Sequence, residues 1–259
     1  MAEGGIWRAI PIFTRKCRIC QLGLDKWINL LSVLPMIPNT AAVSPTGEAY
    51  ARYLEALLAG DRRRCNEQFG AWLNADTDLR TLYQDLIQRS LYDVGVLWEQ
   101  GRVSVATEHL ATAITESLLN LVYPRLFSQP RLDKSAVVTC TANEYHQIGG
   151  KMVADIFELN GWRGYFLGAN TPMNDLMDLI REKRPDVVTL SLTIYFNLEM
   201  LLQTAAAVRA EFPTVPILVG GQAFRWGGRE RAEQIAGVQC LTSLVQLESW
   251  MKSPTPHAH

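Results

Sequence analysis

The chain has few cysteines and no long apolar run, and both absences limit where it can work. Its five cysteines are odd in number and scattered, so no disulfide framework is expected and a reducing cytoplasm is the predicted compartment. The longest apolar stretch near the start, residues 27–36, is far short of the roughly 20 residues that span a bilayer. No segment resembles a secretory signal. We therefore expect a cytoplasmic protein with no membrane segment.

The chain also lacks an excess of charge of either sign. Its 25 basic and 26 acidic residues leave a formal net charge of -1, which offers no bulk positive field to a polyanion. Strong direct binding to nucleic acid is therefore not expected. Hydrophobic residues make up 48% of the 259 residues, the composition of a packed globular protein. No internal repeat indicates a solenoid or a propeller.

The spacing of apolar residues predicts an α/β protein with a helical first half. The predicted parts are an irregular N-terminal extension (1–43), a four-helix-bundle cap (44–130), a Rossmann-like, flavodoxin-like domain with a five-stranded parallel sheet (131–253) and a disordered tail (254–259). The extension holds one C-x-x-C pair, Cys17 and Cys20, without the second half of a zinc site. We expect ordinary thiols there, with a redox switch as the alternative.

In the cap, Thr46, Asp61 and Ser104 are the expected N-caps of the first, second and fourth helices, and the fourth continues to about residue 122. The third helix is predicted as one helix, which is marked by apolar residues from Leu79 to Leu97 and ends near Gly101. In the mixed half, strands are predicted at 136–140, 164–167, 187–192, 216–219 and 238–241, and helices at about 147–159, 173–182, 198–211, 229–235 and 244–251. A ligand of such a sheet lies outside the carboxyl ends of its strands.

Histidine is scarce, and its placement is informative. Of four histidines, His257 and His259 lie in the tail, whereas His146 follows the first predicted strand in the segment 144–149. Two further polar or glycine-containing segments close the third and fourth strands: Ser191-Leu192-Thr193 and Gly220-Gly221. These segments therefore fall at strand ends, where a shared ligand would lie.

The distances between these segments form a pattern. Gly149 and Ser191 are separated by 41 residues, and Thr193 and Gly220 by 26. The order and spacing resemble the cobalamin-binding signature D-x-H-x-x-G, about 41 residues, S-x-L, about 26 to 28 residues, G-G. The resemblance covers the last half of the chain. Its candidate cofactor contacts are Glu144, Tyr145, His146, Gln147, Ile148, Gly149, Ser191, Thr193, Gly220 and Gly221.

The resemblance implies that His146 displaces the cofactor's dimethylbenzimidazole and ligates cobalt from the lower face. It also implies that Ser191 and the glycine pair line a slot for the displaced nucleotide tail. Imidazole is a good neutral cobalt ligand, and a carboxylate two residues away can accept its other N–H. Two positions depart from the signature: Glu144 stands in place of aspartate and Thr193 in place of leucine. The extra methylene of Glu144 allows its hydrogen bond to His146 to be loosened or rerouted through water.

A second motif lies in the cap. Trp98, nine further residues and then Glu108-His109 resemble the W-x9-E-H motif of cobalamin-dependent photoreceptors such as the CarH-type repressors. The resemblance implies that Trp98 shields the upper axial ligand and that Glu108 contacts an adenosyl ribose. His109 is a candidate upper ligand of cobalt. In those repressors a histidine directly follows the tryptophan, and here Glu99 does, so a double-histidine photoproduct of that kind is not predicted.

The combination of cap and cobalamin domain without a winged-helix module resembles the AerR/PpaA antirepressors of photosynthetic bacteria. That resemblance implies a non-enzymatic, light-responsive regulator that binds adenosyl-, methyl- or hydroxocobalamin and contacts a repressor of the CrtJ/PpsR type. One alternative is a corrinoid carrier subunit of a methyltransferase; another is a stand-alone photoreceptor that adds a bilin. A radical mutase is the least expected of the alternatives, because the predicted bundle and sheet leave no room for a substrate barrel. Arg225, Arg229 and Arg231 could meet a cofactor amide or a partner, and Arg62 to Arg64 are expected to form a solvated face.

Overall fold

The computed structural model describes residues 45–253, all within one compact unit of the chain. Their sheet has five strands in the order β2-β1-β3-β4-β5, and every neighbouring pair is parallel. The strands are β1 (Ser135–Cys140), β2 (Arg163–Phe166), β3 (Val187–Ser191), β4 (Ile217–Gly220) and β5 (Val238–Leu241). This is the flavodoxin-like order, whose switch point lies between β1 and β3. The predicted fold class is confirmed.

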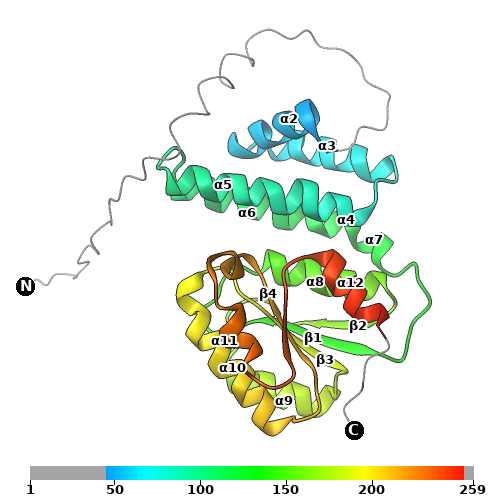
Figure 1. Cartoon of the computed structure of the whole chain (residues 1–259). Coiled ribbons are helices and arrows are strands. Elements are labelled where there is room, and N and C mark those ends of the chain that lie inside the picture. The colour runs from blue at the N-terminus through cyan, green and yellow to red at the C-terminus, as the bar shows by residue number, and fades with distance from the viewer. Residues whose placement is uncertain (1–44, 254–259) are drawn as a thin grey trace, which may run out of the picture. The chain divides into compact units, whose positions relative to one another are not determined.

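Helices cover both faces of the sheet, as Figure 1 shows. One face carries α8 (Ile148–Leu159) and α12 (Leu244–Lys252), and the other carries α9 (Met173–Lys183), α10 (Leu198–Glu211) and α11 (Arg229–Glu233). Alternation along β1 explains the arrangement: Ala136 and Val138 join the hydrophobic cluster under α8, and Val137 joins the cluster under α10. A strand buried on both faces reads as a continuous apolar run, which is how the sequence revealed it.

The cap begins with α2 (Gly47–Leu58) and α3 (Arg62–Asn74). Asp61 caps α3 by accepting a hydrogen bond from the Arg64 N–H, as predicted. Thr46 occupies the N-cap of α2 but its side chain makes no capping bond, which corrects the prediction. Gly47 follows with a left-handed φ of 55°, so the first amides of α2 do not present the geometry that a capping hydroxyl needs.

The third predicted helix is not one α-helix. It consists of α4 (Leu79–Thr81), the π-helical segment η1 (Leu82–Gln88) and α5 (Arg89–Glu99). The π segment has a wider turn and buries Leu82, Tyr83, Leu86 and Ile87. An apolar spacing does not distinguish an α from a π turn over so few residues, because the choice depends on what the helix packs against. Single-turn π segments are frequent at functional sites.

The fourth helix is also shorter than predicted. α6 (Val105–Leu119) begins at the expected cap, Ser104, which accepts a hydrogen bond from the Thr107 N–H. After Leu119 the chain tightens into the 3-10 turn η2 (Asn120–Val122) and continues as α7 (Tyr123–Leu126). Pro124, in the first turn of α7, lacks the N–H that a continuous helix would require there.

The cap and the sheet share one hydrophobic cluster. Tyr53 and Leu82 of the cap belong to the same buried cluster as Ile156 of α8 and Met251 of α12. Burial of common apolar surface therefore holds the two parts together. Within residues 45–253, no helix is long and apolar enough to cross a membrane. The predicted extension, the tail, Cys17 and Cys20 lie outside the described residues.

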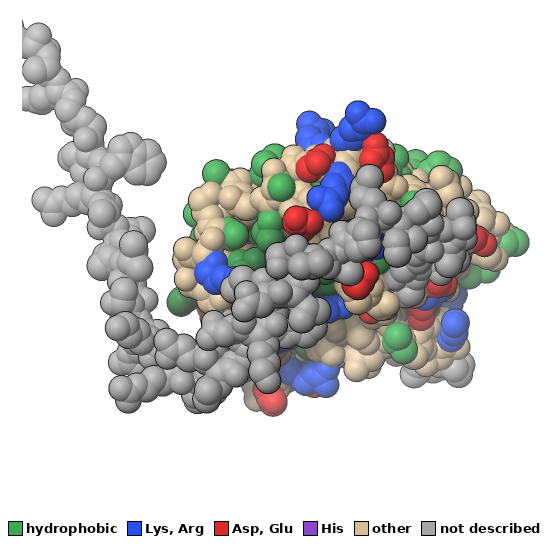
Figure 2. Space-filling view, turned by 90° about the horizontal axis from the view of Figure 1, so that it is seen from above, with side chains coloured by type: hydrophobic (Ala, Val, Ile, Leu, Met, Phe, Trp, Pro, Cys, Tyr) green, Lys and Arg blue, Asp and Glu red, His purple; other side chains and the backbone are tan. Residues whose placement is uncertain are grey.

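The outer face of the cap carries charges of both signs. Figure 2 shows basic and acidic side chains interspersed with apolar ones in the view from above. Arg63 pairs with Glu67 at 2.8 Å, and Arg64 pairs with Glu55 at 3.2 Å. Exposed pairs of this kind contribute little to stability. They agree with the expected solvated face.

Candidate functional site

The predicted sheet residues lie at neighbouring strand ends. Cys140 at the end of β1 is in register with Ser191 of β3, and Ser191 is in register with Gly220 of β4. The loop after β1 carries Glu144 and His146 and leads into α8, whose N-terminus adjoins this edge. The structure therefore brings the separate parts of the signature to one edge of the sheet, at the switch point where ligands bind in such folds.

Glu144 is buried and holds His146 directly. Its Oε1 atom accepts from both the backbone N–H and, at 2.6 Å, the ring Nδ1 of His146. Its Oε2 atom accepts from the backbone N–H groups of Thr193 and Ile194, each at 2.9 Å. The extra methylene neither loosens nor reroutes the bond to His146. It lets one carboxylate bind backbone N–H groups of two loops. Glu144 is fully buried there, with 0% of its surface exposed.

The electrostatics of this pair agree with its geometry. Burial by itself raises the pKa of Glu144, but the hydrogen bonds from His146, Ile194 and Thr193 outweigh burial, and its pKa lies below the ordinary value of 4.5. The hydrogen bond to Glu144 raises the pKa of His146 above its ordinary 6.5, while burial opposes that shift. The negative charge of Glu108, from the cap, raises it further. Cap and sheet residues of the predicted site therefore act on one imidazole.

The His146 ring is positioned as a metal ligand would be. A carboxylate can only accept, so we assign the proton to Nδ1, which leaves the Nε2 lone pair free. The imidazole is 49% exposed, although its partner is fully buried. Metal-binding histidines usually donate their other ring N–H to a carboxylate of this kind, which fixes the orientation of the ring.

Small residues lie beside this loop on the α8 face of the sheet. A Cβ added to Gly149 would lie 3.6 Å from the Ser191 hydroxyl, and one added to Gly150 would lie 3.2 Å from Phe166. Ser191 is 5% exposed and Ile148 is also buried. The N-terminus of α8 thus approaches β3 closely because both positions lack side chains.

The glycine pair at the end of β4 has a backbone role that sequence reasoning missed. A Cβ on Gly220 would meet the Leu241 carbonyl oxygen at 2.5 Å, and one on Gly221 would meet the Leu192 carbonyl oxygen at 2.2 Å. Gly221 also has a φ of 116°. Glycine is required here for close strand packing, in addition to any room it leaves for a ligand.

The cap motif lies where α5 ends and α6 begins. Trp98 is in the last turn of α5 and is 45% exposed. Glu108 accepts from Thr112 and pairs with the neighbouring His109 at 2.6 Å. His109 is 74% exposed and lies seven residues before Glu116, on the same face of α6.

That face of α6 looks toward the sheet site. Glu116 accepts a hydrogen bond from the Gln147 side chain at 3.0 Å, next to His146. A second contact comes from the loop after β4, where the Arg225 guanidinium lies 5.1 Å from the centre of the Tyr92 ring of α5. The structure therefore brings the predicted cap and sheet residues to facing surfaces.

Three arginines near the glycine pair make contacts within the chain. Arg225 stacks on Tyr92, Arg229 donates to the Cys240 carbonyl oxygen, and Arg231 pairs with Glu199 at 2.6 Å. From the sequence, Arg225 could contact either a cofactor amide or a partner protein. In the structure its guanidinium contacts Tyr92 of the cap.

Large apolar side chains remain exposed around the site. In addition to Trp98, the loops after β1, β3 and β4 expose Tyr145, Tyr195, Phe196 and Trp226, with Phe196 95% exposed. Sequence reasoning missed the last three. Their signal was available: aromatic residues directly after a strand end are unusual in a solvated loop. Such a rim suits a large ligand with apolar faces.

Two family models match the chain. Residues 134–241, the sheet domain, match a model described as a B12 binding domain. Residues 49–123, the helices of the cap, match a second model that is also described as a B12 binding domain. These matches support cobalamin as the ligand of the site that the cap and the strand ends form.

Two relatives from Myxococcus xanthus share sequence with the chain. The HTH-type transcriptional repressor CarA is 37% identical over 159 residues, which are 59% of this chain and 52% of the relative. The HTH-type transcriptional repressor CarH is 30% identical over 174 residues, 66% of this chain and 57% of the relative. The chain thus spans little more than half the length of these curated relatives.

A solved structure shares the fold. The monomethylamine corrinoid protein of Methanosarcina barkeri superposes with a TM-score of 0.67 over 79% of this chain and 97% of its own length, at 13% identity. At that identity the likeness shows the fold alone. The residues at the site agree with a corrinoid independently of that likeness, because an oriented imidazole can ligate a metal and an apolar rim suits a large ligand.

Proposed function

We propose that the chain is a cobalamin-binding, light-responsive regulator of transcription that acts as an antirepressor, through contact with a repressor of the CrtJ/PpsR type. The 2.6 Å hydrogen bond by which the buried Glu144 orients the half-exposed His146 ring carries the cobalamin-binding part of the proposal. The similarity to two transcriptional repressors supports the regulatory role. The chain would act as a binding protein and not as an enzyme.

His146 would be the lower axial ligand, with Glu144 holding its tautomer and Gly149 and Ser191 close beside it. Trp98, Glu108 and His109 would face the opposite side, with His109 as the candidate upper ligand. When bound, adenosyl- or methylcobalamin supplies a weak, photolabile cobalt–carbon bond. The loss of an upper group would leave Trp98 without its packing partner, and this exposed side chain has few contacts of its own to restrain it.

Few polar contacts hold the cap at this end. Gln147 to Glu116 and Arg225 to Tyr92 join it to the sheet loops. A displacement of α5 and α6 here would change the surface offered to a partner while the shared core stays intact. In this proposal, the ends of α5 and α6 have two positions, and the bound ligand determines which of the two is populated.

The test is the absorbance spectrum of the purified protein loaded with adenosyl- or hydroxocobalamin, in darkness and after illumination. The expected result is a histidine-ligated corrin spectrum that His146→Ala lacks, with a stable light-driven change in the parent. Binding of the repressor should then differ between the dark and illuminated samples. Identical partner binding in both samples would overturn the antirepressor role even if cobalamin binds.

A corrinoid carrier is the second candidate, because the fold of a monomethylamine corrinoid protein covers most of this chain. It predicts a cofactor that accepts a methyl group from a cognate methyltransferase, with no change of partner binding in light. A bilin between cap and sheet would add absorbance beyond the corrin bands. Methyl transfer, partner binding in light and darkness, and the absorbance spectrum together separate the three proposals.

A further inference from the structure

A groove of about 290 Å³ lies between α3 and α6 on the surface of the cap. Its lining residues are Arg62, Arg63 and Asn66 of α3 with Ile114, Ser117 and Leu118 of α6. The two helices run in the same direction. At their beginnings, a Cβ added to Gly60 would meet Leu110, and beyond their ends Arg125 donates to the Thr77 carbonyl oxygen. No residue of the candidate cofactor site lines this cap groove.

The cap groove has an apolar floor and polar edges of one kind. Ile114 and Leu118 form the floor and are 2% and 3% exposed. The other four lining side chains are exposed and are positively charged or neutral, and no carboxylate of residues 45–253 lines the groove. Such a surface complements apolar side chains that are flanked by negative charge.

Apolar surface continues along α6 beyond both ends of the cap groove. Leu110 precedes Ile114 by one turn and is 42% exposed, and Leu121 follows Ser117 by one turn and is 40% exposed. From Leu110 to Leu121 the row covers three helical turns, about 16 Å. Three turns are the length over which an amphipathic helix buries one face in a groove.

Two features of α3 beside the cap groove do not favour the stability of that helix. Gly70 lies one turn after Asn66, and a Cβ added there would meet nothing within 4 Å, so alanine would fit and would stabilise the helix. Arg62 and Arg63 lie in the first turn, where positive charge is unfavourable. Arg63 pairs with Glu67, but Arg62 makes no ion pair with any residue of the described part of the chain. Close approach of a negatively charged segment explains both features.

We propose that the cap groove binds an amphipathic helix with acidic flanks from a partner protein. The apolar side chains of that helix would cover Leu110, Ile114 and Leu121. Its carboxylates would pair with Arg62 and Arg63, and Gly70 would let its backbone approach α3 closely.

This inference deepens the proposed function, on which its dependence on cobalamin rests, by naming the surface that holds the partner. α6 connects the two sites. Glu116 accepts a hydrogen bond from Gln147 beside His146, and the next residue, Ser117, lines the cap groove. A displacement of α6 at the cofactor site would therefore change the width of the groove.

The test is fluorescence anisotropy of a labelled synthetic peptide of about 18 residues, with leucines at helical spacing and glutamates on both flanks, titrated with the full-length protein. We expect saturable binding that weakens as salt increases. Arg62→Glu should weaken it by about 10-fold or more, because like charges then face each other. A peptide with lysine in place of each glutamate should lose a similar factor. Absence of saturable binding by the glutamate peptide would overturn the proposal.

Arg52→Glu is the matched control. Arg52 is an exposed arginine of α2 that does not line the cap groove, so its substitution changes the net charge equally and should leave binding nearly unchanged. Gly70→Gln places a side chain where the peptide would lie. It should weaken binding while its melting temperature equals or exceeds that of the parent. Equal losses for Arg52→Glu and Arg62→Glu, or unchanged binding by Gly70→Gln, would refute the groove as the binding site.

Competition separates this groove from the function on which it rests. The repressor should displace the peptide from the parent protein and bind Arg62→Glu more weakly. Peptide binding without displacement by the repressor would refute the repressor contact alone and support the groove. Displacement that is equal in darkness and light would refute only the light response. A parent that sediments as a dimer, with Arg62→Glu as a monomer, would assign the groove to a second copy of the chain and overturn the proposal.

Discussion

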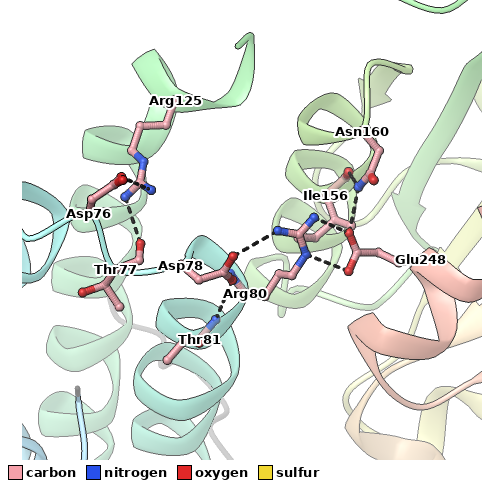
Figure 3. A network of polar contacts seen from close by, with 9 residues as sticks. All are labelled: Asp76, Thr77, Asp78, Arg80, Thr81, Arg125, Ile156, Asn160 and Glu248. Atoms are coloured by element: carbon pink, nitrogen blue, oxygen red, sulfur yellow. Dashed lines mark hydrogen bonds and ion pairs between the residues drawn. The ribbon is translucent and has the colours of Figure 1, made fainter. Parts of the chain in front are cut away.

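The two ends of the contact between cap and sheet differ in kind. At one end, which we call the anchor, Arg80 donates two hydrogen bonds to Glu248 of α12, at 2.7 and 2.5 Å, and Asn160, the C-cap residue of α8, donates a third at 3.0 Å (Figure 3). Nearby, the buried Tyr83 hydroxyl of η1 donates to Asp155 of α8 at 2.7 Å. The anchor is polar, paired and continuous with the shared core.

At the other end, around His146, exposed aromatic side chains replace paired ones. Trp98 and Tyr145 are 45% and 66% exposed, whereas Tyr83 at the anchor is 0% exposed. The comparison teaches that one contact between cap and sheet can be held by paired polar groups at the anchor and leave aromatic side chains exposed to a ligand at the end around His146. Stability should depend on the anchor and on the Glu144 bridge, and ligand response should depend on the exposed end.

The largest loss of stability is expected at Glu144, because one buried carboxylate serves two loops. Glu144→Gln places an amide NH2 against N–H donors and should lower the free energy of unfolding by about 2–3 kcal/mol. Urea unfolding of the ligand-free protein measures the loss. Glu116→Gln, at a single exposed-end contact, is the control. Equal effects of the two variants would contradict the two-loop bridge.

Tyr83→Phe should have the next largest effect. It removes the hydroxyl that Asp155 accepts from, which leaves that buried carboxyl with Lys151 at 3.4 Å as its remaining polar contact from the described residues. We expect a loss of about 1–2 kcal/mol with unchanged cobalamin affinity. A Tyr83→Phe variant that kept its stability but bound cobalamin more weakly would contradict the assignment of Tyr83 to the anchor.

Acid should weaken the anchor. The hydrogen bond from Arg80 lowers the pKa of Glu248 below its ordinary 4.5, burial opposes the shift, and Asn160 adds to it. A carboxyl with a lowered folded-state pKa contributes stability that is present above the unfolded-state pKa and is lost as pH falls through the folded-state pKa. Glu248→Gln should therefore cost about 1 kcal/mol at neutral pH and reduce the steepness of the stability curve below pH 4.5. If Glu248→Gln leaves the slope of stability against pH unchanged, the Arg80–Glu248 pair does not contribute to the stability of the anchor.

Trp98→Ala should have the smallest effect on stability, within about 0.5 kcal/mol, because the side chain is already half exposed. We expect it to abolish the dependence of repressor binding on the upper ligand. The measurement is partner binding with adenosyl- and hydroxocobalamin, beside the thermal melt. A large drop in melting temperature would mean that Trp98 is part of the structural core. Repressor binding that still depends on the upper ligand would mean that Trp98 takes no part in the response.

Much of the fold was predictable from local patterns. Continuous apolar runs such as 216–219 indicate strands buried on both faces, and their alternation with helices determines a parallel sheet because the connections must cross over. The π segment and the missing Thr46 bond were not predictable. Both depend on what surrounds the backbone, namely the packing of η1 and the left-handed Gly47.

The sequence by itself determined the class of site, because the spacing of His146, Ser191 and Gly220 along a parallel sheet brings them to one edge wherever the helices lie. Only the tertiary structure decided how the site is held. Glu144 reaches the Thr193 and Ile194 amides of another loop, and the buried Thr189 hydroxyl finds no hydrogen-bond partner among residues 45–253. Hydrogen bonds between segments distant in sequence depend on distances of a few tenths of an ångström, which residue order does not encode and folding alone establishes.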